Sequence, residues 1–290
     1  MLEAQERLNH LNRSGKRLSK SQRRIWAAMV KEESRAAELS AAKLAALADV
    51  SESTVVRFAV ALGYDGYAQM QKALQELLWH QLTAQDRVGL TADGTPTDVL
   101  RRVLKSDMQN LRGTLDALDP AVFDEAVRRL LTARRIYVVG LRSAAPLAQF
   151  FGHYLNFLTD EVRLIAGNAV DVFESISRIG PEDVLFGISF PRYSTRTVEA
   201  MRYAHAQGAQ VIGLTDGKLS PLGKLSDTCL FAQIDMASFV DSLAAPLSVI
   251  NALLVAMGQE RKDELTRHFN RLERLWDTYD IYLEPEDDDA

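Results

Sequence analysis

Apolar and polar residues follow two different periods along the chain, and the change between them divides the sequence. In residues 18–80 apolar side chains recur every three or four positions, which predicts helices alone. From Arg135 onward, short continuous apolar runs alternate with amphipathic stretches. That pattern is typical of parallel strands that are buried on both faces and separated by helices. The pattern therefore predicts an all-α N-terminal domain followed by an α/β domain.

Three helices are expected in the first part of the chain. Ser19 and Gln22 form a capping box that opens the first helix, whose apolar positions are Ile25, Trp26, Met29 and Val30. The second helix is expected over 41–48, with Leu44, Leu47 and Ala48 facing inward. The third runs from Glu52 to Leu62, with Ser51 as its N-cap and Gly63 as its C′ stop.

The stretch from Lys43 to Phe58 has the spacing of a helix-turn-helix. Two short helices that cross tightly need a small residue at the contact point, which Ala45 supplies. The turn needs a residue that tolerates positive φ, and Asp49 can adopt that conformation. The side chains expected in the three-helix core are Val50, Val55 and Phe58.

A DNA-binding role would place the second helix of this motif in the major groove. The residues expected to contact DNA are Ser51, Glu52, Ser53, Thr54, Arg57 and Lys43, with Val56 on the same outer face and Lys20, Arg23 and Arg24 as further contacts to the DNA backbone. Arg57 is suited to bidentate pairing with guanine, and the serines to phosphates or base edges. The alternative is a small helical bundle whose exposed helix simply carries polar residues.

A linker and a connecting helix are expected over residues 81–118. Thr83–Thr97 has little apolar period and reads as a loose loop, and a helical pattern returns from Asp98 to Leu118. A helix beside a domain boundary either packs against its own chain or forms a dimer seam, and the sequence leaves both open. A further helix is expected over Ala121–Leu131.

The C-terminal part, residues 119–283, is expected to be one doubly wound domain with a five-stranded parallel sheet. The predicted strands are Ile136–Val139, Val162–Ile165, Asp183–Ile188, Gln210–Leu214 and Thr228–Ile234. The predicted helices between and after them are Ala144–Leu158, Val170–Arg178, Thr195–Gln207 and Val240–Gln259. In such sheets the ligand binds at the carboxyl ends of the strands, near a switch point in the strand order.

Two loops that follow strands carry residues suited to an anion. The first contributes Gly140, Arg142 and Ser143, and the second contributes Ser189, Arg192, Ser194 and Thr195. Hydroxyl groups and backbone N–H groups at the start of a helix favour negative charge. Ordinary N-capping is the alternative for each loop taken alone, while two serine-bearing loops after adjacent strands favour a ligand site.

Val50–Phe58 followed by Leu62-Gly-Tyr-Asp-Gly-Tyr67 resembles the N-terminal domain of the MurR/RpiR family of bacterial transcription regulators. Tyr64 and Tyr67 are expected to pack on the three-helix core. The α/β part is similar to the SIS (sugar isomerase) domain, which binds phosphosugars and commonly follows that helix-turn-helix. The resemblance implies that Ser143 and Ser189 hold the ligand phosphate and that Ser194 or Thr195 closes the pocket.

The second loop departs from the pattern of that family. The SIS domain commonly carries Ser-x-Ser-Gly-x-Thr, whereas this chain has Ser189-Phe-Pro-Arg-Tyr-Ser-Thr195. Pro191 removes a backbone donor, and Arg192 adds a cation that can pair with phosphate or carboxylate. A phosphosugar remains the default ligand, and an acidic metabolite that is not a sugar is the alternative.

Composition and charge modify this picture only slightly. The 290 residues carry a net charge of −5, which alone argues against nucleic acid, but residues 1–80 hold 12 basic and 9 acidic residues, a net of +3. Five acidic residues fall in residues 284–290, which are expected to form a disordered tail.

Cys229 is the single cysteine of the sequence, which excludes an internal disulfide and a cysteine-based zinc site. No signal-peptide pattern opens the chain, and the apolar stretch Leu243–Met257 is too short to span a bilayer. A soluble cytoplasmic protein is expected.

The sequence thus favours a DNA-binding transcription regulator that senses a small anionic metabolite. It is expected to act as a homodimer or homotetramer on near-palindromic double-stranded DNA, with no catalytic residue, cofactor, metal or membrane partner. A sugar-phosphate isomerase is the alternative, although no general base can be named for it: His153 and Glu174 fall on different predicted helices. A metabolite sensor that acts on a protein partner is a third possibility.

Overall fold

The computed structural model describes residues 19–32, 36–37, 39–71, 73–74, 94–167, 171–235 and 239–283, and it divides into two units, residues 1–87 and 88–290. Each unit has its own hydrophobic core. Most of the expected linker Thr83–Thr97 and the whole acidic tail of residues 284–290 lie outside the described residues.

The first unit is helical, as its apolar period predicts. Its helices include α2 (Lys20–Glu32), α3 (Ala41–Ala48) and α4 (Glu52–Ala61), and residues 67–71 and 73–74 are also helical. The capping box of α2 is present: the Ser19 N–H donates to Gln22 Oε1 at 2.8 Å, and the Gln22 N–H donates to Ser19 Oγ at 3.2 Å. Gly63 takes the positive φ expected of a C′ stop.

The core of this unit matches the predicted one in most positions. The fully or nearly buried side chains include Ile25, Met29, Leu44, Ala45, Ala48, Val55, Phe58, Tyr64 and Tyr67, with Val50 half-buried. The inward placement of Leu47 was wrong, because its side chain is exposed, as is that of Val30 in the first helix. Each lies next to a buried position, and one residue of helix turns a side chain by about 100°.

The second unit is an α/β domain with one parallel sheet. Its strands are β1 (Ile136–Gly140), β2 (Val162–Ala166), β3 (Val184–Ile188), β4 (Gln210–Thr215) and β5 (Thr228–Phe231). They pair in the order β2-β1-β3-β4-β5, and every pairing is parallel. This confirms the predicted doubly wound, five-stranded sheet.

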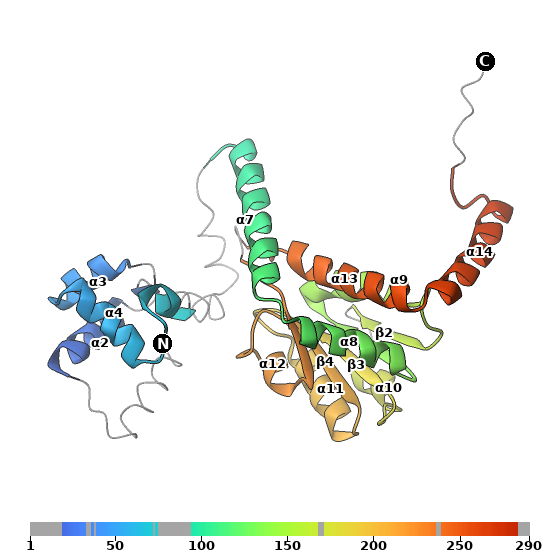
Figure 1. The fold of residues 1–290 in the computed structure, drawn as a ribbon, viewed down its shortest axis with the longest axis horizontal. Helices are drawn as coiled ribbons and strands as arrows, with labels where there is room; N and C mark the ends of the chain where they lie inside the picture. Colours follow the sequence, from blue (N-terminus) through green and yellow to red (C-terminus); the bar gives the residue numbers. More distant parts are fainter. Residues whose placement is uncertain are drawn as a thin grey trace, which may run out of the picture. The chain divides into compact units, whose positions relative to one another are not determined.

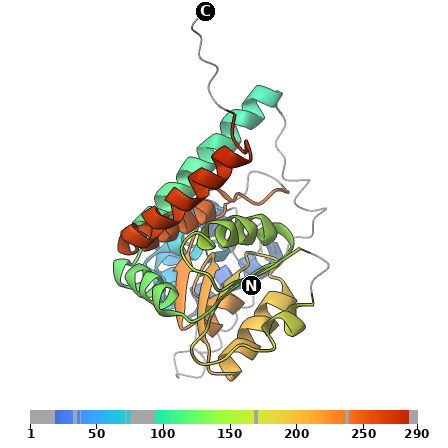
Figure 2. The same ribbon diagram turned by 90° about the vertical axis from the view of Figure 1, so that its right-hand side faces the viewer.

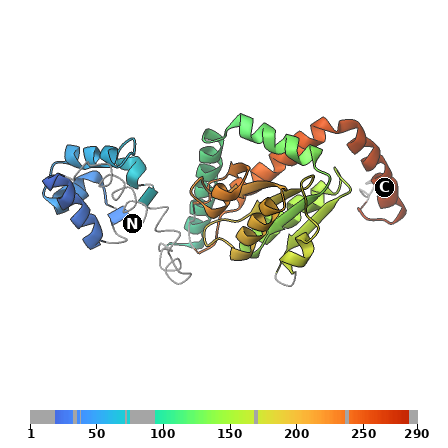
Figure 3. The ribbon, with the colours of Figure 1, turned by 90° about the horizontal axis from the view of Figure 1, so that it is seen from below.

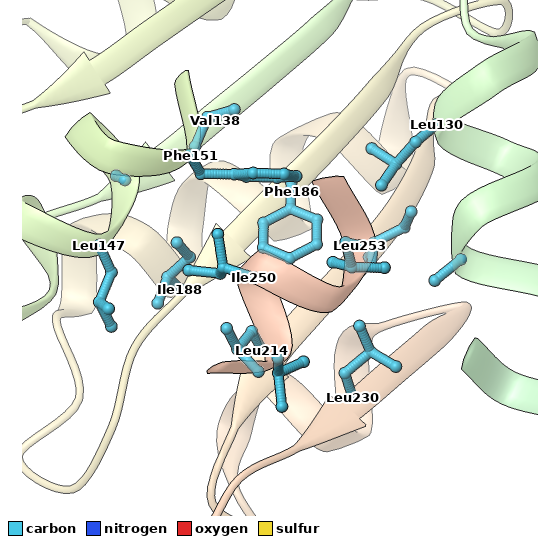
Figure 4. Packing of buried hydrophobic residues seen from close by; sticks show 14 of the residues in the cluster. Leu130, Val138, Leu147, Phe151, Phe186, Ile188, Leu214, Leu230, Ile250 and Leu253 are labelled. Atoms are coloured by element: carbon cyan, nitrogen blue, oxygen red, sulfur yellow. The ribbon is translucent and has the colours of Figure 1, made fainter. Parts of the chain in front are cut away.

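Helices cover both faces of the sheet, as Figure 3 shows. One layer consists of α8 (Pro120–Thr132), α9 (Ala145–Leu155) and α13 (Ala244–Glu260), and the other of α10 (Val172–Ile176), α11 (Thr195–Ala206) and α12 (Pro221–Leu225). Alternate strand residues enter the two cores, because successive side chains point to opposite faces. Phe186 therefore packs against Phe151, Ile250 and Leu253 of the first layer (Figure 4), while its neighbour Leu185 faces the second.

Three elements at the C-terminal end differ from the prediction. α13 begins at Ala244 rather than at residue 240, and the Ser242 hydroxyl just before it donates to Asp107 Oδ1 at 2.6 Å. Ser220 caps α12, a short helix that the apolar pattern does not predict, by accepting from the Gly223 N–H at 2.9 Å. A further helix, α14 (Lys262–Thr278), follows α13 and was not predicted.

Two long helices of this unit stand at opposite ends of α13. α7 (Pro96–Asp116) precedes α8, and α14 ends the described chain; both rise in the same direction (Figures 1 and 2). In α14 the ring of Phe269 has its centroid 5.4 Å from that of Phe157, and the ring of His268 lies 6.1 Å from it. Across the described part of the chain, no helix combines the length and apolarity needed to cross a membrane.

Candidate functional sites

The turn between α3 and α4 has the geometry that a helix-turn-helix requires. Asp49 adopts the left-handed conformation (φ 50°, ψ 56°), and its N–H donates to the carbonyl groups of Ala45 and Ala46. Ala45 is buried where the helices cross, so the small residue stands where it was expected. The Asp49 carboxylate also pairs with the guanidinium of Arg24 on α2. The turn is thus tied to the first helix as well as to its neighbours.

The N-terminal part of α4 presents a polar surface to solvent. The side chains of Ser51, Glu52, Ser53, Val56 and Arg57 are exposed, with Thr54 half-buried between them. Arg57 folds back along its own helix, where Nε donates to the Ser53 carbonyl and Nη2 to Thr54 Oγ1, both at 3.3 Å. These weak bonds to a neighbouring turn leave the guanidinium able to extend outward.

Ser51 occupies the N-cap position but does not act as predicted. Its hydroxyl makes no bond to a backbone N–H of α4; it lies 2.8 Å from Thr54 Oγ1 and 3.0 Å from Ser53 Oγ. The first N–H groups of α4 therefore lack the side-chain acceptor that usually satisfies them. The Thr54 N–H donates to the Ser51 carbonyl instead, at 2.9 Å. A helix N-terminus without a side-chain cap suits an anion.

The remaining basic residues proposed for this surface lie on the other two helices. Lys20, Arg23 and Arg24 belong to α2, Lys43 belongs to the first turn of α3, and all four are exposed. The structure therefore keeps these cations at the surface of the first unit, and Arg24 is the one that has the ion pair with Asp49.

The two anion-suited loops of the second unit begin side by side. Gly140 ends β1 and pairs in register with Ile188, which ends β3. The chain leaves β1 for α9 on one face of the sheet and leaves β3 for α11 on the other. This divergence is the switch point at which open parallel sheets bind ligands.

The first loop turns sharply into a short 3-10 helix, η2 (Arg142–Ala144), before α9. A Cβ added at Gly140 would stand 2.7 Å from Ala148 Cβ and 2.8 Å from the Ala144 carbonyl oxygen, so only glycine allows this close return. Arg142 is held at φ 57°, and the side chains of Arg142 and Ser143 are exposed.

The second loop is held by its own hydroxyl groups. Ser189 is buried, and its Oγ accepts from the Ser194 N–H at 3.0 Å. Ser194 in turn caps α11 by accepting from the Thr197 N–H, and Thr195 is exposed at the start of that helix. Arg192 is exposed and has φ 66°.

Sequence reasoning missed the bond that ties this loop to the next strand. The Tyr193 hydroxyl donates to the two oxygens of Asp216 at 2.8 and 3.1 Å, and the Thr215 hydroxyl also donates to Asp216 at 2.9 Å. Asp216 is absent from the candidate residues that the sequence offers. Its position directly after an apolar strand was the available signal, since the carboxyl ends of parallel strands share one edge.

Left-handed backbone conformation concentrates in these sites. Among the described residues the non-glycine positions with positive φ are Asp49, Arg142, Arg192 and Asp280. Each costs of order 1 kcal/mol, and such strain is often retained where a site needs an unusual conformation. Three of the four lie in the two candidate sites.

Other candidates are weaker. His153 and Glu174 cannot form an acid–base pair, because α9 and α10 cover opposite faces of the sheet.

A cleft of about 430 Å³ lies at the opposite edge of the sheet, away from the two loops. It is formed between α14 and the segments that precede β1 and β2. Burial raises the pKa of the Cys229 thiol to about 12, so it is not a nucleophile. In the described ranges, no three His, Cys, Asp or Glu side chains gather as metal ligands.

Comparison with protein families supports the same division of the chain. Residues 5–81 match the helix-turn-helix domain of the rpiR family, and residues 129–256 match the SIS domain. The HTH-type transcriptional regulator HexR of Pseudomonas aeruginosa is 28% identical over 273 residues, which is 92% of each chain. An HTH-type transcriptional regulator of Caldanaerobacter subterraneus is 27% identical and covers 80% of this chain and 83% of its own.

Solved structures show the same architecture. The sugar isomerase domain of an RpiR transcription factor from Sphaerobacter thermophilus is 26% identical with a TM-score of 0.58, over 60% of this chain and 97% of that one. NanR of Vibrio vulnificus, in a complex with ManNAc-6P, is 22% identical with a TM-score of 0.56, over 93% and 98% of the two chains. At that identity the likeness to NanR shows the fold alone.

Proposed function

Because the chain belongs to the RpiR family of transcription regulators, in which a helix-turn-helix domain precedes a SIS domain, we propose that α3 and α4 read an operator while the loops after β1 and β3 bind a small anionic metabolite. The default metabolite is a phosphosugar. We assign residues 1–80 to DNA binding, 81–118 to the linker and connecting helix, 119–283 to the effector domain and 284–290 to an acidic tail. We place the protein in the cytoplasm, acting on near-palindromic DNA.

The exposed start of α4 is the observation that supports DNA reading. Its N–H groups lack a side-chain acceptor, and Arg57 stands next to them without an ion pair among the residues that the structure describes. In the proposed complex a phosphate lies near this N-terminus, Arg57 swings out to pair with a guanine, and Val56 meets a thymine methyl group. Ser51, Glu52, Ser53 and Thr54 line the same surface, and Lys43 contacts the DNA backbone.

The pairing of Gly140 with Ile188 is the observation that supports the effector site. It brings the starts of the two loops together at one switch point. On this basis we assign the effector to Ser143 and Arg142 of the first loop and to Ser189 and Arg192 of the second. Ser189 Oγ accepts one bond but keeps its own proton to donate to a phosphate oxygen. Ser194 and Thr195 begin α11, whose N-terminus favours negative charge. NanR binds a phosphosugar, and the shared fold makes that ligand class the first to test.

Effector and DNA then act on one equilibrium between two arrangements of the protein. A ligand shifts that equilibrium only by its difference in affinity for the two arrangements. By linkage, if the effector weakens operator binding tenfold, operator weakens effector binding tenfold. Measuring both affinities therefore tests the proposal from two directions.

The deciding experiment measures binding to the DNA upstream of the protein's own gene and to random DNA of equal length, at several salt concentrations. We expect affinity to fall steeply with salt on both, and the specific DNA to bind at least 10³-fold more tightly. Equal affinity for the two DNAs would refute the assignment as a sequence-specific regulator.

Arg57→Ala tests the assigned base contact in the same assay. Losing a bidentate contact to guanine is expected to weaken specific binding by about 1–3 kcal/mol and to leave binding to random DNA nearly unchanged. Lys43→Ala is the matched control. Loss of a phosphate contact weakens binding to both DNAs alike and lowers the slope of log affinity against log salt concentration by about 1. If Arg57→Ala behaved like Lys43→Ala, Arg57 would be a backbone contact.

Effector binding is tested with hexose 6-phosphates, their parent hexoses and inorganic phosphate. We expect the phosphorylated sugars to raise the thermal midpoint and the parent hexoses to leave it unchanged. Measurable aldose–ketose conversion of any of these sugars would overturn the assignment as a regulator without enzyme activity.

A further inference from the structure

The cleft beside α14 lies within the second unit, at the edge of the sheet opposite the two effector loops. One wall is α14, and the other consists of residues 156–161, between α9 and β2, together with Arg134. Its volume of about 430 Å³ falls in the range of pockets that hold small ligands. The proposed effector occupies the other end of the strands, so the proposed function makes no use of this cleft.

Three arginines line the cleft without a carboxylate partner among the residues that the structure describes. Arg267 and Arg271 lie one turn apart on α14, and both side chains are exposed. Arg261, between α13 and α14, is half-buried; its Nη1 donates to the Leu158 carbonyl at 2.9 Å and its Nη2 to the Leu131 carbonyl at 2.6 Å. These bonds hold the start of α14 against the end of α8 and the segment after α9, so the cleft has a fixed base.

Two rings and two carboxylates share the lining with these arginines. Phe157 and the imidazole of His268 are half-buried, with their ring centroids 6.1 Å apart. Such rings stack on the flat faces of nucleobases. Asp160 and Glu264 are exposed and make no ion pair within the described ranges. Carboxylates of this kind accept hydrogen bonds from the ribose hydroxyl groups of bound nucleotides.

The other charged side chains of the cleft already have partners in the protein. Arg134 pairs with Asp183 at 2.8 Å, and Glu161 pairs with Arg135 at 2.9 Å. The cleft therefore offers a ligand three cations and two carboxylates. Guanidinium groups bind phosphate in a planar, bidentate geometry. A matching ligand carries a phosphate, a flat ring and several hydroxyl groups.

We propose that the cleft binds a nucleoside 5′-monophosphate. Its phosphate pairs with Arg267 and Arg271, its base lies against Phe157 and His268, and its ribose hydroxyl groups donate to the two free carboxylates. A sugar phosphate lacks the flat ring, and inorganic phosphate lacks the ring and the hydroxyl groups of a sugar. The inference goes beyond the proposed function and does not rest on it, because the site and its ligand class are both different.

The test titrates the full-length protein with adenosine 5′-monophosphate in a calorimeter, without DNA or sugar phosphate. We expect a dissociation constant below about 1 mM. Inorganic phosphate is the competitor and is expected to displace the nucleotide only at about tenfold higher concentration or more, because it meets the arginines alone. Absence of binding up to about 1 mM would overturn the proposal. Displacement by phosphate at equal concentration would leave an anion site without the base and ribose contacts, and so would overturn the nucleotide.

Substitutions on α14 place the phosphate. Arg267→Gln and Arg271→Gln each remove one charge-assisted contact and are expected to weaken nucleotide binding about tenfold. Arg274→Gln makes the same charge change on the same helix, outside the lining, and is expected to leave the affinity unchanged. All three side chains are exposed, so circular dichroism spectra should match wild type. If Arg274→Gln weakened binding as much as the other two, the attraction would be general and the cleft would not be the site.

His268→Ala tests the base contact. Loss of the imidazole is expected to weaken nucleotide binding about tenfold, because stacking contributes to the affinity for each base. His205→Ala is the control, since His205 lies on α11 outside the lining. A His268→Ala variant that binds the nucleotide as tightly as His205→Ala would show that the base does not lie against this ring, and the nucleotide would be the wrong ligand.

Ser143→Ala separates the cleft from the effector loops. Ser143 follows β1 at the opposite edge of the sheet, so this variant is expected to bind the nucleotide as wild type does. If it weakened the nucleotide while Arg267→Gln did not, the nucleotide would occupy the effector site, which would overturn the present inference and keep that site. A protein that binds the nucleotide in the cleft and ignores both operator and sugar phosphates keeps this inference and loses the proposed function.

Discussion

The two serines assigned to the effector phosphate differ in what else they do, and this difference can be measured. Ser143 is exposed, whereas Ser189 is buried and accepts the Ser194 N–H. We expect Ser143→Ala to weaken effector binding and leave the thermal midpoint of the free protein unchanged. Ser189→Ala should weaken binding and also cost about 1–2 kcal/mol of stability, because a backbone donor loses its acceptor. Calorimetric titration and thermal denaturation of both variants check this. Unchanged effector affinity in both would move the site elsewhere.

Arg192 combines a left-handed backbone with an exposed cation, so glycine separates the two properties. Glycine adopts φ 66° without steric penalty and is expected to stabilise the free protein by about 0.5–1 kcal/mol. The same change removes the guanidinium and should weaken binding of a phosphorylated effector several-fold. Thermal denaturation with and without effector measures both effects. A stabilised variant that binds as well as wild type would show Arg192 to be a loop charge only.

For single residues, the sequence predicted those conformations that depend only on neighbouring positions in the chain. Asp49 and Gly63 could be assigned positive φ because a tight turn and a helix stop each constrain one residue. The hydroxyl of Ser51 was misassigned because Ser53 and Thr54 offer competing partners one turn away. The bond from Tyr193 to Asp216 joins loops 23 residues apart, and no local pattern carries it.

Among the elements, α7 shows where sequence pattern stops being sufficient. Its apolar period predicted a helix, and the helix exists, but the period alone cannot say which face meets the domain. That is decided by Asn110 and Thr114, whose bonds go to the segment after β5, more than 100 residues away. α14 was missed although Leu265, Phe269, Leu272 and Trp276 recur at helical spacing. None of its residues is buried, so the helix adds little to the core of the domain.

The attachment of α7 gives a test at the same scale. Asn110→Ala removes both bonds to Asp235 and is expected to cost the second unit about 2 kcal/mol, which lowers its midpoint by about 4–8 °C. Gln109→Ala is the matched control, because its side chain is exposed one position along the same helix. Denaturant unfolding followed by circular dichroism compares them. Equal stability of the two variants would mean that the polar face of α7 does not hold the helix in place.

For the whole molecule, the parallel sheet is what makes the effector site predictable. Once β1 and β3 are adjacent, their carboxyl ends meet, and so do the loops that follow them. Continuous apolar runs in the sequence predicted five parallel strands. The candidate site residues were then chosen because they follow the carboxyl ends of adjacent strands, and not because of a motif in the residues next to them. The opposite edge carries the cleft beside α14, for which the strand pattern offered no signal.

The two separate cores predict two unfolding transitions, and a matched pair of substitutions assigns them. Ile25 is buried only in the core of the first unit and Ile212 only in that of the second. Ile25→Val and Ile212→Val each delete one methylene group and cost about 1 kcal/mol. The first substitution should lower only the midpoint of the smaller unit's transition, by about 4–8 °C, and the second only that of the larger unit, by about 2–4 °C.

Effector binding gives a second test of the same two transitions. Effector at 100 times its Kd adds about 2.7 kcal/mol to the stability of the unit that binds it, so it should raise the midpoint of the larger unit alone. Differential scanning calorimetry resolves these shifts. One transition that moves with both substitutions would mean that the units fold as a single cooperative body, and the effector signal would then reach the DNA-reading helices through folding itself.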